Sequence, residues 1–180
     1  MSSPTDPDLP DFLPGRLTLR AGTHKDYLAL CKYHYAAGAP ATWAGTWTID
    51  YADPRRAARP VAVGVLSYPV PSSRPRERHL RLSPDRRANV AFANRHVRTI
   101  SRVIVHPQFR ALGLSSVLVR WICSHCPVRY VEAMARMGDV CPLFERGGMT
   151  RVPAVDPDEP AYFVFDRETV LASHFKGAVD

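Results

Sequence analysis

The stretch that decides the fold is residues 99–116, which read TISRVIVHPQFRALGLSS. Its first half contains an apolar, β-branched run at 103–105, which is typical of a buried central strand. Pro107 cannot continue a sheet ladder, so we expect this strand to end near His106. An apolar helical pattern then opens near Ser115. The stretch therefore predicts a strand, a turn, a loop and the start of a helix.

The loop between this strand and helix runs from Arg110 to Ser115 and contains a glycine at position 113. A loop that leads directly into a helix aims several unpaired backbone N–H groups at one point, and the helix dipole adds positive potential there. Such an arrangement suits a pyrophosphate. Neither the G-x-G-x-x-G fingerprint nor a Walker loop is present. The alternative is an ordinary strand-to-helix turn that carries a basic residue.

Further strands and helices are predicted on both sides of this stretch. Thr23 and Asp26 are spaced to cap a helix that begins at His24 and runs to about Tyr35. A second helix is expected at about 116–126. Apolar runs and alternation predict strands at 16–20, 42–51, 60–68, 95–104, 128–134 and 161–166.

The order of these elements and two of their motifs resemble the GNAT superfamily of N-acetyltransferases. In that family a strand ending in Val is followed by Arg or Gln, two residues, Gly, one residue, and then Gly or Ala. Here Val105, Arg110 and Gly113 match, and Ser115 stands at the last small position. The family's second motif is an Asn followed by Phe-Tyr-Glu-Lys, one residue, Gly and Phe. Here the matching residues are Leu143, Phe144, Glu145, Arg146, Gly148 and Met149.

This resemblance implies an α+β, GNAT-like fold. We expect a mixed, mostly antiparallel sheet with helices on both faces and a splayed central pair of parallel strands. The domain is expected to span 15–168, between a disordered or loosely docked arm at 1–14 and a tail at 169–180. Residues 70–94, rich in Arg and Pro, are expected to form a long irregular insertion between strands.

The resemblance also implies acetyl-CoA, or another acyl-CoA, as co-substrate. The acyl-CoA would enter the gap between the splayed strands. The backbones of Val103 and Val105 would pair with the pantetheine arm, and Arg110 would add positive charge. The pyrophosphate would be held by the backbone N–H groups of Ala111, Leu112, Gly113, Leu114 and Ser115.

The sequence departs from the family where the catalytic acid is expected. The usual tyrosine is replaced by Phe144, which cannot donate a proton, and the usual asparagine is absent, with Cys141 nearby. The candidate catalytic residues are Glu132, His34, Tyr35 and Cys141, with His106 directly after the central strand. Each has an ordinary structural alternative: a strand carboxylate paired with an arginine, a helix-end His-Tyr pair, a buried cysteine or a strand-end histidine.

Two branches of this fold share further residues with the chain. The acetyltransferase-like domain found fused to ABC-type ATPases is similar in the run Arg102-Val103-x-Val105-His106-Pro107 and in the strand Val131-Glu132-Ala133. No ABC ATPase motif occurs in this chain. The phage Mom-like family, which modifies adenine in DNA, is similar mainly at His34-Tyr35.

Three functions follow from these observations. The first is a CoA-dependent N-acyltransferase that acts on an unidentified amine. The second is a nucleic-acid base modification on the same fold, and the third is a binding module for acyl-CoA or nucleic acid without turnover. The formal net charge of +7 favours an anionic partner, although an arginine-rich composition also arises from a GC-rich genome.

The remaining composition narrows the class of protein. The length suits one domain with a real core. No stretch is long and apolar enough to cross a membrane, and the polar, acidic N-terminus lacks a signal pattern, so we expect a cytoplasmic protein. The four cysteines do not indicate a disulfide scaffold. Residues 123–126 (CSHC) resemble half a zinc site, but no second half exists, so we expect no metal.

Overall fold

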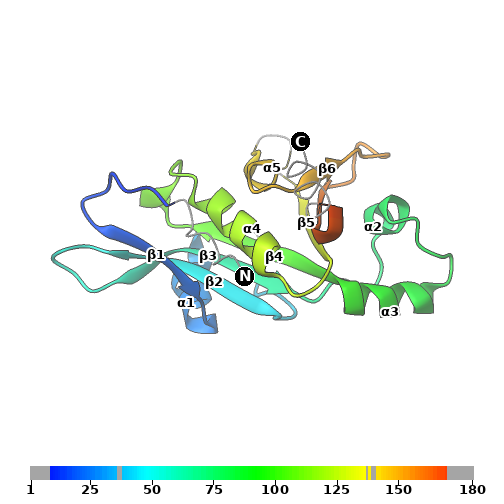
Figure 1. Ribbon diagram of the computed structural model, residues 1–180, viewed down its shortest axis with the longest axis horizontal. Coiled ribbons are helices and arrows are strands. Elements are labelled where there is room, and N and C mark those ends of the chain that lie inside the picture. Colours follow the sequence, from blue (N-terminus) through cyan, green and yellow to red (C-terminus); the bar gives the residue numbers. More distant parts are fainter. Residues whose placement is uncertain (1–8, 36–37, 137, 139–140, 170–180) are drawn as a thin grey trace, which may run out of the picture.

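The computed structural model describes residues 9–35, 38–136, 138 and 141–169. A seven-stranded sheet in the order β1-β2-β3-β4-β5-β7-β6 runs through the molecule (Figure 1). The strands are β1 (Arg16–Ala21), β2 (Gly45–Ala52), β3 (Arg59–Ser67), β4 (Val97–Val105), β5 (Tyr130–Ala135), β6 (Thr150–Val152) and β7 (Ala161–Asp166). The helices are α1 (His24–Leu30), α2 (Arg74–His79), α3 (Arg86–His96), α4 (Leu114–His125) and α5 (Leu143–Arg146). All paired strands are antiparallel except β4 and β5, which confirms the expected α+β class with one parallel pair.

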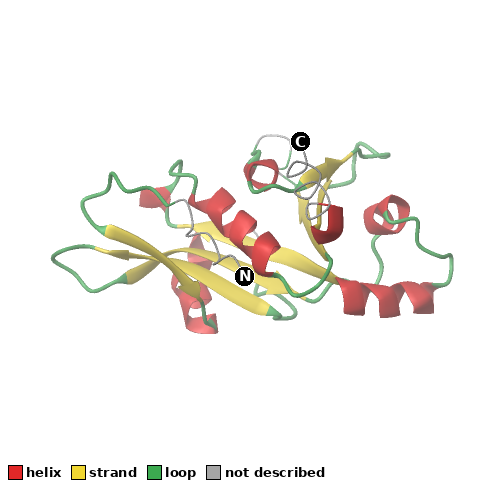
Figure 2. Ribbon diagram, viewed as in Figure 1, coloured by secondary structure: helices red, strands yellow, loops and turns green. Residues whose placement is uncertain are grey.

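Helices α1 and α4 cover opposite faces of the sheet (Figure 2). On one face Tyr27 and Leu30 of α1 pack with Ile104 of β4. On the other face α4 lies close to β3, because Gly64 has no side chain: a Cβ there would stand 2.7 Å from the Cδ1 of Ile122. Burial of these apolar side chains on both faces makes β3 and β4 the centre of the core.

The central strands separate halfway along their length. Strand β4 pairs with β5 only from Val97 to Thr99, whose last partner is Glu132. Two residues further, the β3–β4 register shifts so that Ser101 has no Cα partner on β3. This bulge is fixed by a hydrogen bond between the hydroxyls of Ser101 and Ser67 (2.6 Å) and by the Ser101 hydroxyl near the Val65 carbonyl (3.3 Å). Because a bulge bends the strand that carries it, β4 turns away from β5 and leaves a gap in the sheet.

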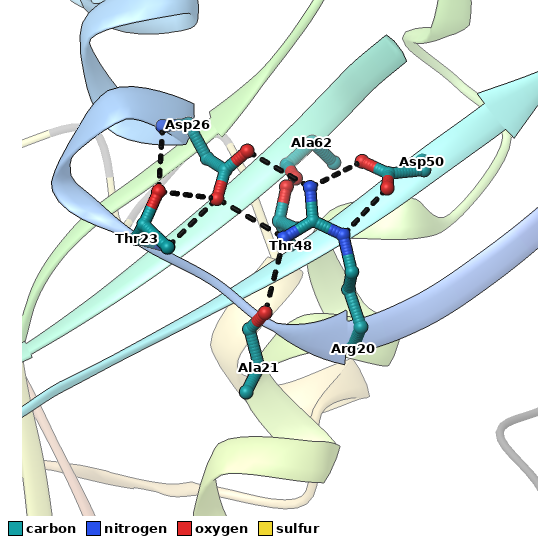
Figure 3. Close-up of polar contacts among 7 residues, drawn as sticks. All are labelled: Arg20, Ala21, Thr23, Asp26, Thr48, Asp50 and Ala62. Atoms are coloured by element: carbon teal, nitrogen blue, oxygen red, sulfur yellow. Dashed lines mark hydrogen bonds and ion pairs between the residues drawn. The ribbon is translucent and has the colours of Figure 1, made fainter. Parts of the chain in front are cut away.

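Helix α1 is fixed to the sheet by its first turn. Thr23 and Asp26 form the expected capping box, which confirms the predicted start of this helix. Figure 3 shows the Arg20 guanidinium between two carboxylates, with Asp26 at 2.9 Å and Asp50 of β2 at 2.6 Å. The Arg20 hydrogen bond also holds the pKa of Asp26 below its ordinary value. Helix α1, β1 and β2 are thereby tied together at one point.

The prediction that residues 70–94 form an irregular insertion is wrong in its local structure. It contains α2 and most of α3, which lie together at one end of the molecule (Figure 2), and α3 delays the start of β4 to Val97. Pro75 lies in the first turn of α2, where a missing N–H costs nothing, and the arginines are good helix formers. The only fully buried side chains of α3 are Asn89 and Ala93, so no apolar periodicity marked this helix in the sequence.

Other predicted boundaries shift by a few residues. The first helix ends at Leu30, a 3₁₀ turn follows at Cys31–Tyr33, and His34 is extended, which carries the next residues toward β4. Strand β6 was missed, because three residues are too few to show alternation. Of the expected loose arm, Leu9 and Leu13 pack against the core, whereas 1–8 lie outside the described residues, as does the expected tail beyond 169.

Candidate functional site

The gap between β4 and β5 contains a cavity of about 420 Å³. Its walls are residues 100–105 of β4, Met134 and Ala135 of β5, the 33–35 segment after α1, Arg110, and residues 141, 143 and 144 around α5. A second cavity of about 300 Å³ shares Val105, Arg110, Cys141 and Leu143 with it. The second cavity is lined by the loop before α4 and by the first residues of that helix. The two cavities therefore form one channel along β4 to the start of α4.

The outer edge of β4 presents unpaired backbone groups to this channel. The N–H of His106 donates to the Val61 carbonyl of β3 at 2.8 Å. Because successive residues of a strand point to opposite sides, Val103 and Val105 turn their N–H and C=O groups away from β3 and toward the gap. The Val105 carbonyl accepts a hydrogen bond from Arg110 Nε at 3.4 Å, as this orientation requires. An extended ligand with amide groups would find strand-like partners here.

Several backbone N–H donors lie in the loop at the end of the channel, residues 111–115. Within the described part of the chain, no acceptor is recorded for the backbone N–H groups of residues 111–115. Gly113 is the N-cap of α4 with φ +77°, and its carbonyl accepts from Ser116 and Val117. Backbone N–H groups in and just before a helix start that have no acceptor among the described residues make a site for an anion, and the helix dipole adds to it.

Ala111 in this loop has φ +63°, a left-handed conformation that a residue with a Cβ rarely adopts. We expect Ala111→Gly to stabilise the fold by about 1 kcal/mol, because removing the Cβ relieves local strain of about 1–2 kcal/mol but adds freedom to the unfolded chain. Urea unfolding of the two proteins measures this difference. Equal stability, or a less stable variant, would show that the loop is not strained at this residue.

Arg110 carries the positive charge of this end of the channel. Its Nε and Nη2 donate to the carbonyls of Val105 (3.4 Å) and Tyr33 (3.3 Å). It forms no ion pair with a carboxylate of the described residues. The guanidinium is therefore held in place by neutral partners while its charge stays available to a ligand.

A tyrosine–histidine pair that the sequence analysis missed lies beside Arg110. Tyr33 lines the cavity, and its hydroxyl oxygen is 3.2 Å from Nε2 of His106. The Nδ1 of His106 accepts the Gln108 N–H at 3.3 Å, so the neutral ring carries its proton on Nε2 and donates it to the Tyr33 oxygen. In this tautomer the Tyr33 hydroxyl accepts from His106, so its own proton is not used in this hydrogen bond. The run of rings at 33–35 was the available signal, but only its last two members were singled out.

The pKa of His106 lies below its ordinary value because of burial and because of the positive charges of Arg59, Lys32 and Arg110. The folded protein therefore favours the neutral ring. The stability that this ring contributes is complete above the ordinary histidine pKa of about 6.5 and is lost as the pH falls through the lowered folded value. We expect unfolding midpoints measured from pH 7.5 to pH 5 to fall more steeply for the wild type than for His106→Gln. Parallel slopes would contradict this.

The structure brings three of the four predicted catalytic residues to the cavity. His34 and Tyr35 line it with their rings stacked at 4.6 Å, and the Tyr35 side chain is 67% exposed. Cys141 is exposed and borders both cavities. Phe144 also lines the cavity and packs on Phe163 with 5.0 Å between ring centroids.

Glu132 is not among the residues that line the cavity. Its carboxylate is fully buried and forms a two-pronged ion pair with Arg76 of α2, at 2.8 and 2.9 Å. The hydroxyls of Thr99 and Tyr162 also donate to it, at 2.8 and 3.0 Å. A carboxylate with four donors has no lone pair left for a substrate amine, so this geometry matches the structural alternative for Glu132.

Residues 123–126 (CSHC) lie at the C-terminal end of α4, with Cys126 as its C-cap. Among the residues that the structure describes, no three His, Cys, Asp or Glu side chains lie together as a metal site. Cys123 and Cys126 are buried, and burial raises the pKa of both thiols. No helix in the described part of the chain has the length and apolar character needed to span a bilayer.

Comparison with known proteins shows which fold this is. No family model matches the sequence, and no curated protein matches it. Among solved structures, AAC(6')-Ib in complex with paromomycin and acetyl-CoA matches with a TM-score of 0.51 at 16% identity, over 86% of this chain and 96% of that one. A KacTA–DNA complex matches with a TM-score of 0.52 at 9% identity, over 89% and 99%.

AtaTR bound with acetyl-CoA matches with a TM-score of 0.50 at 12% identity, over 88% of this chain and 98% of that one. Each match covers nearly the whole of the solved chain, so the similarity extends across the sheet and both helical faces. At these identities the similarity concerns the fold. The chain therefore has the GNAT-like α+β fold that the order of its elements and its two motifs predicted.

Proposed function

We propose that this protein is an acyl-CoA-dependent N-acyltransferase that binds its acyl-CoA in the channel between β4 and β5. The observation that carries the proposal is the alignment of two donor sets along one channel. The backbone N–H groups of Ala111, Gly113, Leu114 and Ser115, which have no acceptor among the described residues, lie at one end, and the outward backbone groups of Val103 and Val105 follow along β4. Leu112 lines neither cavity. A pyrophosphate joined to an arm of amides has complementary chemistry in the same order.

The charges support the same ligand. The pyrophosphate of CoA carries negative charge, and the channel offers it the dipole of α4 and the unpaired guanidinium of Arg110. Glycine at 113 leaves open space, since a Cβ there would meet no atom within 4 Å. Acetyl-CoA is bound in the AAC(6')-Ib and AtaTR structures on this fold.

The reaction is a direct transfer to an amine. The amine nitrogen forms a bond to the thioester carbonyl carbon, and the C–S bond breaks. The amine loses one proton, and the CoA thiolate that leaves takes up one proton. We propose that the groups lining the cavity at 33–35 move these protons, with the Tyr33 hydroxyl oriented by His106. Phe144 has no proton to give, and Cys141 is the remaining candidate from the sequence.

A nucleic-acid acceptor is the second candidate. Its support is the set of exposed arginines on α3 (Arg86, Arg87 and Arg95), together with the DNA named in the KacTA structure. Phosphate contacts by such arginines would make affinity fall steeply with salt. A duplex or single strand that binds with no dependence on salt concentration, or no binding at low salt, would remove this candidate.

Calorimetric titration with acetyl-CoA, and with free CoA in parallel, tests the main proposal. We expect both to bind with similar affinity, because the channel contacts are to the pyrophosphate and the amide arm that they share. A failure of both to bind would overturn the proposal. Thiol release from acetyl-CoA in the presence of a panel of amines then separates an enzyme from a binding module.

A further inference from the structure

Arg102 of β4 is a second arginine in the lining of the first cavity, and it does not line the second cavity at the loop. Its Nη1 donates to the Ser101 carbonyl at 2.7 Å and its Nη2 to the Gly38 carbonyl at 3.2 Å. Its Nε is buried and has no hydrogen-bond partner. Arg102 forms no ion pair with any carboxylate of the described residues. Neutral carbonyls therefore hold a cation whose charge is not balanced.

The surroundings of Arg102 strengthen the electrostatic attraction that its charge exerts on an anion. The described lining of the cavity contains Arg102 and Arg110 and no Asp or Glu. Residues 100, 103, 134, 143 and 144 supply apolar walls, so little in the lining screens the two guanidinium groups. Positive charge also acts on the neighbouring His106, whose pKa is lowered by burial and by Arg59, Lys32 and Arg110.

We propose that the acceptor amine of this transferase also carries an oxyanion group, a carboxylate or a phosphate, which Arg102 binds. This inference rests on the proposed acyl-CoA channel: the loop and Arg110 bind the CoA pyrophosphate, which leaves Arg102 as the cation for the other substrate. A guanidinium presents paired N–H donors that match the oxygens of either oxyanion. A polycationic amine would instead meet two like charges in the cavity.

The same group also positions the amine. An oxyanion bound at Arg102 lies beside the bulge at Ser101, where β4 leaves β5 and the cavity begins. A small molecule anchored there places its amine further along the channel, toward the thioester end of the bound acyl-CoA. Arg102 is thus a specificity-determining residue, and its loss is expected to raise the acceptor KM with a smaller effect on the CoA affinity.

Matched pairs of amines test the proposal. Calorimetry with and without saturating CoA compares β-alanine with β-alaninamide and O-phosphoethanolamine with ethanolamine, and spermidine serves as a polycation. We expect at least one anionic member to bind about tenfold or more tightly than its neutral partner, because hydrogen bonds to a charged group contribute that much. Which of the two anions binds distinguishes a carboxylate from a phosphate acceptor. Equal binding within both pairs, preference for spermidine, or no binding of either anion would overturn it.

Variants assign the effect to Arg102. Arg102→Met should abolish the preference for the anion, and Arg102→Lys should retain part of it, because the charge remains but the fork is lost. Arg120→Met, a change at an exposed arginine of α4, is the control and should bind the probes as the wild type does. Circular dichroism establishes that each variant is folded. If acetyl-CoA binds all variants but the preference survives in Arg102→Met, this inference fails while the proposed function stands; if acetyl-CoA binds none of them, the proposed function fails.

Discussion

Arg76→Met is expected to destabilise the protein by about 3–5 kcal/mol, the cost of leaving a buried charge without its partner. The Arg76 side chain is 1% exposed and that of Glu132 is 0% exposed, and their two hydrogen bonds are 2.8 and 2.9 Å long. Without Arg76, Glu132 would keep only the hydroxyls of Thr99 and Tyr162 as donors. The carboxylate would then have to take up a proton or draw in water.

Chemical unfolding of a small set of variants tests this expectation. The double variant Arg76→Met/Glu132→Met removes both charges and should recover a large part of the loss. Arg78→Met is the matched control on the same helix, because the ion pair of Arg78 with Glu159 lies at the surface and should matter far less. A single variant Arg76→Met as stable as Arg78→Met would contradict the account of this pair.

The buried pair also links the insertion to the site. Glu132 is the last residue of β5 that pairs with β4, so Arg76 fixes the sheet at the point where the gap opens. We expect Arg76→Met to weaken ligand binding in the channel only as far as it unfolds the protein. Glu132 then acts through structure, and its geometry gives it no access to a substrate.

Gly113→Asp is expected to lower the affinity for acetyl-CoA by at least about 100-fold. The added carboxylate would stand beside the proposed pyrophosphate seat, and two unit charges about 4 Å apart repel by about 4 kcal/mol at the effective dielectric of a protein surface. Strain also arises, because Gly113 has φ +77° and any side chain is disfavoured there.

Gly148→Asp separates the charge from the strain. Gly148 has φ +91° and, like Gly113, open space where a Cβ would stand, but it does not line either cavity of the channel. Both variants should lose similar stability, and only Gly113→Asp should lose acetyl-CoA binding in calorimetry. Equal affinities for the two variants would place the pyrophosphate elsewhere.

Local sequence patterns were enough to predict most of the fold and the proposed cofactor loop. The β-branched run at 103–105, Pro107 and Gly113 fix a strand, its end and a helix start through contacts within about twenty residues, and such patterns are legible in one sequence. The capping box of α1 is equally local, and it is present as expected.

Contacts between residues that are far apart in the chain could not be predicted from the sequence. Glu132 stands 56 residues from Arg76, and Tyr33 stands 73 residues from His106, so neither pair leaves a pattern of spacing. Helix α3 buries few side chains, so its sequence has no apolar periodicity from which the helix could be predicted. The partners of charged side chains are therefore the part of this site that only the structure supplies.

Amide-resolved NMR of the protein titrated with acetyl-CoA tests the central claim most directly. The account predicts that the backbone N–H signals of Val103, Val105 and residues 111–115 shift together and saturate with one affinity, while those of α3 stay in place. Saturable binding that leaves the 111–115 signals unmoved, or no binding at all, would contradict it.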